Sequence, residues 1–343
     1  MRILLGMSGG LDSTYAAHKL MAEGHTVEGA VLKMHEYTEI DEAREAAESI
    51  GIPLHVIDCR EDFEKRVVGY FLEEYPKGRT PNPCVVCNSE IKFSSLLGFA
   101  IDNGFDYIAT GHYAGVVATD YKGTRRYTVA CAEDSKKDQT YVLWRLSQEI
   151  LSRLLLPLAD SKKSEIREEA ASLGMVAADR GESQEICFIP SGEYAEFIEA
   201  HVGESLHGNF IDPEGNVLGE HQGIINYTIG QRKGLGIAMG TRVFVTEIDP
   251  ENNTVTLSKD ASYTDEITVS GMNFVGIGEP EINEETELFV KVRYLAPKVK
   301  CTLKYLGGGR GAVKISIPQR AVTPGQSAVF YDETGLACGG FID

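Results

Sequence analysis

Short apolar runs alternate with amphipathic segments over the first part of the chain. Runs of strand length cover Arg2–Gly6, Val27–Lys33 and Leu54–Asp58. Between them, small and apolar residues recur at helical spacing in Asp12–Glu23 and Ile40–Ile50. Strands that alternate with helices are typical of a parallel sheet covered on both faces. The pattern therefore predicts an α/β domain at the start of the chain.

The same texture continues further along the chain. The spacing predicts a helix near Asp62–Tyr75 and another strand of the sheet at Asp106–Thr110. Helices are then expected to dominate from about residue 138 to residue 174, with one more near Tyr194–His201. The α/β domain is thus expected to extend to about residue 206.

Beyond His207 the pattern changes to short alternating runs such as Arg242–Ile248 and Leu288–Tyr294. Turns rich in Gly, Pro and Asn separate these runs, which is typical of an all-β region. The region is long enough for two small units, with a boundary near Gly271. We therefore expect three domains, over residues 1–206, 207–270 and 271–343.

The composition is that of an ordinary globular protein, with 343 residues and 43% hydrophobic side chains. The N-terminus lacks the pattern of a signal peptide, and no apolar run reaches the roughly 20 residues of a membrane helix. A cytoplasmic protein with no membrane partner is therefore expected. Seven cysteines cannot all pair within one chain, so reduced or reactive thiols are expected. The net charge of −18 argues against nucleic-acid binding except through a local basic surface.

A glycine-rich turn follows the first strand and opens the first helix. Its glycines allow a tight turn with bare amides, its serines add hydroxyl donors, and the helix start adds a partial positive charge. The plain alternative is a capped turn without a ligand. The context favours a cradle for pyrophosphate, made by Gly6, Met7, Ser8, Gly9, Gly10, Leu11, Asp12 and Ser13.

No Gly-Lys-Ser/Thr follows these glycines, so the turn is not a Walker A loop. It resembles the PP-loop of ATP pyrophosphatases, which cleave ATP to AMP and pyrophosphate and adenylate a carbonyl oxygen. That resemblance implies ATP and Mg²⁺ as cofactors. Glutamine-dependent synthetases share the loop, but they need an ammonia source and no glutaminase segment is recognisable.

The cysteines offer a different nucleophile. Cys84 and Cys87 stand in a segment that its prolines mark as a loop, and Cys187 lies far downstream in an apolar setting. A lone cysteine is most often a small buried hydrophobe. That interpretation suits the four in strand-like runs, namely Cys59, Cys131, Cys301 and Cys338.

Further motifs make the resemblance specific. The chain is similar to the tRNA-specific 2-thiouridylase family from its first strand to its last residues. The matching segments are Gly78–Pro83, Cys87–Asn88, Glu90–Phe93, Ala109–Tyr113, Lys137–Gln139 with Tyr141, Ile186–Ile189, Thr228–Gly236, Arg293–Tyr294 and Pro324–Gln326. The resemblance implies a PP-loop domain, a small central domain and a C-terminal β-barrel. It also implies thiolation of the wobble uridine of tRNA at its 2-position.

The resemblance assigns roles by position. Cys187 corresponds to the residue that receives a persulfide from a sulfur carrier, and Cys87 to the partner that forms a disulfide with it. The segment that holds the target base corresponds to Asn82, Pro83 and Cys84. ATP contacts correspond to Gly6–Ser13, Leu32 and Gly111. Contacts to tRNA correspond to His112, Lys137, Asp138, Gln139, Arg293, Tyr294 and Gln326.

Two positions depart from the family pattern. The family usually has Asp where this chain has Cys84, and a longer acidic insertion after its second strand, where this chain continues from Lys33 into Met34 and His35. The resulting Cys84-x-x-Cys87 spacing suggests a second route for sulfur. Together with Cys187, the pair would hold a 4Fe-4S cluster with one open iron for hydrosulfide. The sequence leaves this route and the persulfide route open.

Other functions remain to be weighed. Another PP-loop ATP pyrophosphatase, either an amidating synthetase or a different tRNA-modifying enzyme, would not need Cys87 and Cys187. A non-catalytic tRNA-binding protein would not need an intact PP-loop. For tRNA binding we expect a basic face that contains Lys137, Arg232, Lys233 and Arg293.

Overall fold

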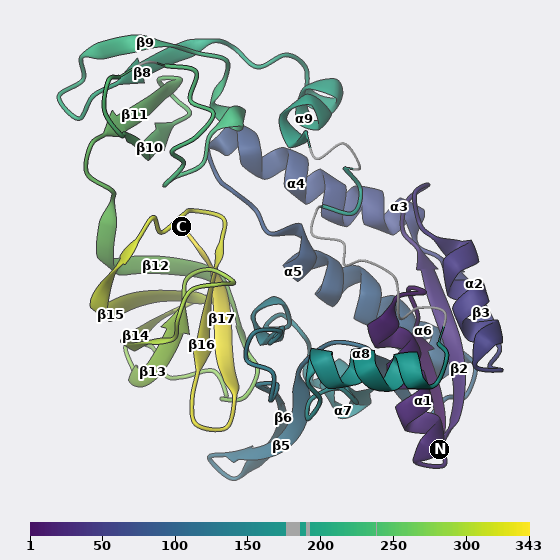
Figure 1. Cartoon of the computed structure of the whole chain (residues 1–343). Coiled ribbons are helices and arrows are strands. Elements are labelled where there is room, and N and C mark those ends of the chain that lie inside the picture. Colours follow the sequence, from purple (N-terminus) through teal and green to yellow (C-terminus); the bar gives the residue numbers. More distant parts are fainter. Residues whose placement is uncertain (176–185, 190–192, 238) are drawn as a thin grey trace.

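The computed structural model describes residues 1–175, 186–189, 193–237 and 239–343. The α/β domain is built on a parallel sheet (Figure 1). Its strands run in the order β3-β2-β1-β4-β7 and are all parallel. They are β1 (Arg2–Gly6), β2 (Thr26–Lys33), β3 (Leu54–Asp58), β4 (Tyr107–Thr110) and β7 (Leu154–Leu155). The parallel sheet predicted from the apolar runs is confirmed.

Successive residues of β1 serve two separate cores. Ile3 and Leu5 pack with α1 (Leu11–Ala22) and α8 (Lys163–Ser172), whereas Leu4 packs with α6 (Phe93–Asp102) on the other face. All three of these side chains are fully buried. Side chains alternate between the faces of a strand, so an unbroken apolar run needs cover on both sides. The expected two-faced cover is therefore confirmed.

The connection from β3 to β4 is almost entirely helical. It begins with α3 (Arg60–Phe63), a π-helical turn η1 (Glu64–Val68), α4 (Gly69–Glu74) and the 3₁₀ turn η2 (Tyr75–Lys77). It continues through α5 (Pro83–Cys87) and a second π-helical turn η3 (Asn88–Lys92) into α6. The helix α2 (Ile40–Ser49) covers β2 and β3 nearby.

The prediction of a loop around Cys84 and Cys87 is wrong, because these residues form α5. The Asn82 side chain accepts a hydrogen bond from the backbone amide of Cys84 at 3.2 Å, and Pro83 occupies the first helical turn. Asn is a favoured N-cap, and Pro is tolerated at the first helical position, where its missing amide is not needed. The prolines thus begin a helix here instead of excluding one.

The residues after β4 also differ from the expectation. An antiparallel hairpin, β5 (Gly115–Tyr121) and β6 (Thr124–Ala130), leaves the sheet. Only η4 (Thr140–Val142), α7 (Gln148–Ser152) and α8 represent the helices that were expected to dominate this region. The helix α9 (Tyr194–Val202) was predicted.

Two β units complete the chain. A four-stranded sheet has the order β10-β11-β8-β9, with β8 (Gly208–Ile211), β9 (Val217–His221), β10 (Phe244–Asp249) and β11 (Thr254–Ser258); the turn η6 (Ile224–Asn226) follows β9. A closed barrel has the order β12-β15-β14-β13-β16-β17. Its strands are β12 (Tyr263–Phe274), β13 (Glu285–Lys291), β14 (Val299–Gly307), β15 (Arg310–Arg320), β16 (Ser327–Tyr331) and β17 (Leu336–Ile342). The predicted all-β texture and the barrel are confirmed.

The barrel is joined to the α/β domain by buried aromatic side chains. The Trp144 indole donates to Ser327 Oγ at 3.0 Å, and the Tyr141 hydroxyl donates to the Ser327 carbonyl at 2.9 Å. A Cβ at Gly339 would lie 2.5 Å from the Trp144 ring, so only glycine fits beneath it. The interface is therefore packed like a protein core.

One helical segment, residues 83–102, is long and apolar enough to cross a membrane by length and composition alone. Half of it is buried within the protein. Val85, Ile91 and Phe93 are fully buried in the core beneath the sheet. This segment is accordingly a core helix of the α/β domain.

Candidate active site

The glycine-rich turn lies between β1 and α1 and is held by its own serines. Ser13 Oγ accepts a hydrogen bond from the Ser8 amide at 3.3 Å and donates to the Gly10 carbonyl at 3.0 Å. Gly9 has φ +81°, and a Cβ there would lie 2.6 Å from the Glu42 backbone. The turn therefore requires glycine, and it presents its amides at the start of a 12-residue helix.

The end of β4 closes against this turn. A Cβ at Gly111 would lie 2.8 Å from the backbone of Asp12 and Ser13. The Tyr113 hydroxyl donates to Asp12 Oδ1 at 2.7 Å, and the Lys163 ammonium lies 2.6 Å from the same oxygen. The predicted nucleotide residues thus come together at the carboxyl ends of the strands, where α/β proteins bind ligands. Leu32, at the end of the neighbouring β2, is buried beside them.

Cys84 and Cys87 lie three residues apart on α5 and so share one helix face. Burial raises the pKa of the Cys87 thiol to about 12. The Lys92 ammonium acts in the opposite direction and lowers this pKa, whereas Cys187 and Cys84 raise it. Partial loss of water around its sulfur also raises the pKa of Cys187, although the residue is exposed, and the charge of Lys92 again acts in the opposite direction. The three thiols therefore interact electrostatically, although they come from distant parts of the sequence.

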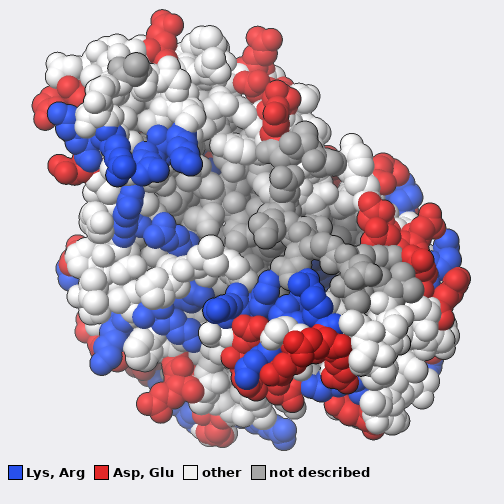
Figure 2. Space-filling model, in the orientation of Figure 1, with Lys and Arg blue, Asp and Glu red and all other residues white. Residues whose placement is uncertain are grey.

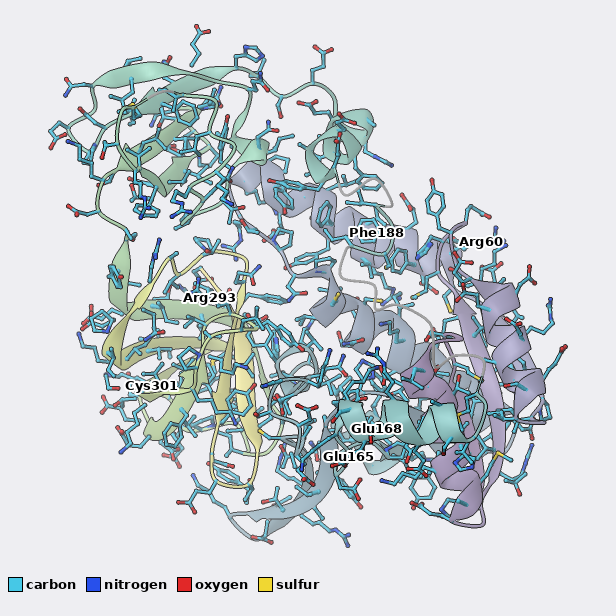
Figure 3. The ribbon with its side chains drawn as sticks, viewed as in Figure 1. Arg60, Glu165, Glu168, Phe188, Arg293 and Cys301 are labelled. Atoms are coloured by element: carbon cyan, nitrogen blue, oxygen red, sulfur yellow. The ribbon has the colours of Figure 1, made fainter. Side chains whose placement is uncertain are left out.

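The side chains around Cys187 fix its segment. The ring centre of Phe188, which is labelled in Figure 3, lies 5.6 Å from that of Phe63 and 5.4 Å from that of Phe71. Phe188 is buried, whereas Cys187 is exposed. The aromatic cluster thus anchors the segment beside α3 and α4 while the thiol stays accessible.

The three thiols do not form a metal site as they are placed. Within the described residues, which include all three, no group of three Cys, His, Asp or Glu side chains is arranged to hold a metal ion. A cluster needs its thiolates around one common centre. The arrangement does not fit the 4Fe-4S cluster that the spacing of Cys84 and Cys87 suggested.

His112 follows the turn into the site. Its Nδ1 lies 2.8 Å from Thr110 Oγ1, and its ring packs 5.5 Å from that of Phe93. Burial, and then the charge of Lys92, lowers the pKa of His112 to about 3. His112 is therefore neutral at physiological pH.

Several residues that the resemblance assigned to tRNA make hydrogen bonds within the protein. Asp138 Oδ1 accepts from the Thr140 hydroxyl at 2.5 Å, and Gln139 Oε1 accepts from the Tyr113 amide at 2.8 Å. Gln326 Nε2 donates to the Thr80 carbonyl at 2.8 Å. These polar groups fix loops around the site.

The barrel contributes the remaining members of the predicted set. Arg293 is exposed and lies at the end of the barrel (Figure 3). The ring centre of Tyr294 lies 5.9 Å from that of Tyr141. Lys137 is half-buried on the loop before η4. Lys and Arg side chains gather on this face over the barrel and the four-stranded sheet, while Asp and Glu crowd the edge near α2 (Figure 2).

Cys131 departs from the expectation of a buried cysteine. It lies just after β6 and is exposed, and its sulfur lies 2.9 Å from the Lys298 ammonium. A strand-like run predicted burial, but the run ends one residue earlier. By contrast, Cys59, Cys301 and Cys338 are buried as predicted.

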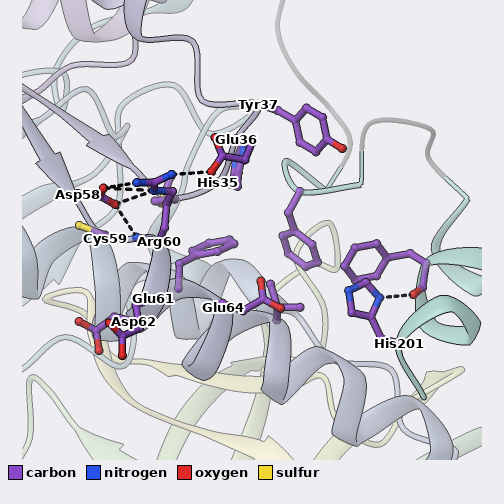
Figure 4. Close-up of a pocket in the computed structure, with 15 residues that line it drawn as sticks. His35, Glu36, Tyr37, Asp58, Cys59, Arg60, Glu61, Asp62, Glu64 and His201 are labelled. Atoms are coloured by element: carbon purple, nitrogen blue, oxygen red, sulfur yellow. Dashed lines mark hydrogen bonds and ion pairs between the residues drawn. The ribbon is translucent and has the colours of Figure 1, made fainter. Parts of the chain in front are cut away.

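The sequence pattern gave no sign of a cavity of about 750 Å³, whose lining includes Cys59 and Phe188 (Figure 4). It is lined by the residues after β2 and β3 and by α9. Arg60 is paired there with Asp58 at 2.7 Å and Glu36 at 2.6 Å. Met34, which lines the cavity, lies with its sulfur 3.7 Å from that of Cys87.

Known families cover the whole chain. The model described as tRNA methyl transferase HUP domain matches residues 1–191, the tRNA methyl transferase PRC-barrel domain matches 195–259, and the aminomethyltransferase beta-barrel domain matches 264–342. Among solved structures, a predicted subunit of tRNA methyltransferase from Methanocaldococcus jannaschii matches 50% of this chain and 74% of its own. It has 15% identity and a TM-score of 0.33, which is too weak a likeness to support a function.

Curated relatives match over their full length. The tRNA-specific 2-thiouridylase MnmA of Acetivibrio thermocellus is 42% identical, with 99% of each chain covered. The protein of the same name from Carboxydothermus hydrogenoformans is 43% identical over 100% of this chain and 97% of its own. That of Clostridium acetobutylicum is 43% identical over 99% of both. With such identity along its entire length, the chain belongs to the tRNA-specific 2-thiouridylase family.

Proposed function

We propose that the protein is an ATP-dependent tRNA sulfurtransferase that converts the wobble uridine to 2-thiouridine through a Cys187 persulfide. The relatives supply the class of reaction. The observation that supports the mechanism is that one α/β domain holds both a phosphate-binding turn and the thiols of Cys87 and Cys187, which are close enough for their charges to interact. The enzyme works on tRNA in the cytoplasm and takes sulfur from a persulfide-bearing protein. A sulfide-supplying protein would feed the same route through the Cys87–Cys187 disulfide left by a previous turnover, which hydrosulfide cleaves to a Cys187 persulfide and a free Cys87 thiol.

The first step is adenylation of the uridine. The 2-oxygen attacks the α-phosphorus of ATP, and pyrophosphate leaves. The turn from Ser8 to Ser13 holds the pyrophosphate with its amides and the helix start. Mg²⁺ would neutralise charge on the phosphates, and the Asp12 carboxylate is the oxygen ligand that this turn would offer it.

The second step transfers sulfur. The terminal sulfur of the Cys187 persulfide attacks C2, a C–S bond forms, and AMP leaves with the electron pair of the C–O bond. Cys87 then attacks the inner sulfur of Cys187, which releases the 2-thiouridine and forms a disulfide. A thiol reductant restores both cysteines before the next cycle. No step passes through a metal cluster.

The loop that carries the target base comes from the start of α5. Asn82 and Pro83 lie directly before Cys84 and Cys87, so a uridine bound there reaches the thiols. Wobble bases are recognised after they leave the stack of the anticodon loop, and their edges then meet protein groups. Lys137, Arg293 and Tyr294 bind the surrounding RNA.

The products of ATP and the modified nucleoside test the proposal together. Labelled ATP, unmodified tRNA and a persulfide donor are incubated with the protein, and nucleosides are separated by mass spectrometry. We expect AMP, pyrophosphate and 2-thiouridine in equal amounts. Formation of ADP and phosphate, or full thiolation by a Cys187→Ser variant, would contradict the mechanism.

A further inference from the structure

The Lys92 ammonium lies close enough to Cys87 and Cys187 for its charge to act on both thiols. Lys92 ends the π-helical turn η3, in which the Phe93 amide donates to the carbonyl of Asn88, five residues earlier. In an α-helix, residues five apart point about 140° away from each other. A π-helical turn instead closes its hydrogen bond over five residues and brings such residues onto one face. The turn therefore puts Lys92 on the helix face that carries Cys87.

Lys92 lacks a carboxylate partner within the described part of the chain, although its charge acts on the thiols. Among the residues that the structure describes, no carboxylate pairs with its ammonium and no group accepts a hydrogen bond from it. Its side chain is nevertheless only partly exposed. Removing a cation from water without a counter-ion costs free energy. A site that keeps such a cation is suited to an anion that arrives with the substrates.

The surroundings of Lys92 indicate which anion it meets. The positive charge of Lys92 lowers the pKa of the Cys87 and Cys187 thiols, against the effect of their surroundings. The same charge lowers the pKa of His112, which follows directly after Gly111 at the nucleotide turn. The ring of Phe93, the next residue, packs 5.5 Å from the ring of His112, so Lys92 lies near the residue that follows the nucleotide turn as well as near the thiols.

We propose that the Lys92 ammonium is an anion-binding group of the reacting centre, which stabilises the negative charge as it passes from the attacking sulfur to the departing AMP. The inference rests on the proposed function. In the step concerned, the anionic sulfur forms its bond to C2, the C–O bond breaks, and its electron pair leaves on the phosphate oxygen of AMP. A fixed cation beside this path stabilises the transition state without reorganising.

Three variants separate this role from a structural one. Lys92→Gln removes the charge, and Lys92→Arg restores it on a different head group. Lys65→Gln is the matched control, because Lys65 lies in the other π-helical turn, η1, and is exposed. Two rates are measured for each variant, namely tRNA-dependent pyrophosphate release without a sulfur source and single-turnover thiolation with sodium sulfide or a persulfide donor.

The two rates should respond differently. With Lys92→Gln we expect pyrophosphate release to stay within about tenfold of the original protein while thiolation falls by about 10²–10³-fold, as for the loss of one transition-state donor. Lys92→Arg should recover most of the thiolation rate, and Lys65→Gln should change neither rate.

Two outcomes would overturn the inference. One is thiolation by Lys92→Gln at the original rate, and the other is an equal loss of both rates that Lys92→Arg does not recover. Failure of the proposed function has a different signature, because the unaltered protein itself would then make no 2-thiouridine.

Discussion

The environments of the cysteines divide them into buried, accessible and paired groups. Cys301 and Cys338 are buried in the barrel, where burial raises the pKa of both thiols and makes them inert. Cys187 is accessible and close to a cation, which suits a sulfur carrier. Cys87 is buried beside it, which suits a partner that reacts only after sulfur has left. Single residues thus receive different chemistry from burial and nearby charge alone.

Single substitutions distinguish the persulfide route from a cluster. Because Cys187 carries the sulfur and Cys87 resolves the intermediate, we expect their Ala variants to lose thiolation by more than about 100-fold. Cys84→Ala should retain most of the activity, since the three thiols do not form a ligand set. Nucleoside mass spectrometry gives the rates, and iron analysis of anaerobically purified protein gives the metal content. Stoichiometric iron together with an inactive Cys84→Ala variant would restore the cluster hypothesis.

His112 should make the protein less stable in mild acid. Its pKa is lowered to about 3 in the folded state, whereas an unfolded histidine titrates near 6.5. The unfolded state therefore binds the proton first as the pH falls below about 6.5, and the free energy of unfolding drops by up to about 1.4 kcal/mol per pH unit.

Urea unfolding at pH 7.5 and pH 5.5 measures this effect. We expect His112→Gln to reduce the loss of stability between the two pH values by about 1 kcal/mol. His207→Gln serves as the control, because His207 is exposed. Equal losses in the unaltered protein and in His112→Gln would show that His112 is not kept neutral by the fold.

At the scale of the element, the sequence predicted what depends on local periodicity. The strands β1 to β4 and the helices α1 and α2 end within a few residues of their expected limits, because each buries a regular apolar pattern. The two-residue strand β7 was missed, since helices were expected there. The helix α5 was missed because Asn82 and Pro83 are equally good signals for a turn and for a helix start. The approach of Lys92 to Cys187 could not be predicted, since it depends on a π-helical turn and on contacts between distant segments.

The Asn82 cap is the element-scale feature with a clear test. Asn82→Ala should cost about 1 kcal/mol of stability through loss of the hydrogen bond to the Cys84 amide, and it should also slow thiolation because α5 carries the thiols. Ser147→Ala is a matched control, since Ser147 caps α7 through the Ile150 amide. Both variants should lose similar stability in urea, but only Asn82→Ala should lose activity. A fully active Asn82→Ala variant would show that the start of α5 is not needed to position the thiols.

At the scale of the molecule, one short segment links all three units. The hydroxyl oxygens of Thr80 and Thr228 lie 3.2 Å apart, next to the four-stranded sheet. The Thr80 carbonyl accepts a hydrogen bond from the Gln326 side chain of the barrel. Arg79 donates to the Ile342 carbonyl at 2.9 Å. The residues just before the Asn82 cap are thus held from both sides. The β units therefore support the base-binding segment as well as the RNA surface.

Because the whole molecule is acidic, tRNA binding depends on where the Lys and Arg side chains lie on its surface. The net charge of −18 repels RNA at long range, so binding must depend on the face that carries Lys and Arg over the barrel and the four-stranded sheet (Figure 2). Each phosphate contact releases counter-ions, so affinity should fall steeply with salt. Filter binding of tRNA at 50–300 mM KCl should therefore give a strongly negative slope of log K against log salt, and a flat slope would contradict a charged interface.

Individual positions then report on which charges touch the RNA. Arg293 is exposed at the end of the barrel, so Arg293→Gln should weaken binding and reduce the magnitude of the salt slope by about 1. Lys314→Gln provides a matched control on the same barrel, because the Lys314 ammonium already lies 2.9 Å from both Asp265 and Glu266. Its charge is balanced within the protein, so its removal should leave the slope unchanged. If the two variants change the slope equally, the response comes from the charge of the barrel as a whole, and Arg293 makes no specific contact with a phosphate.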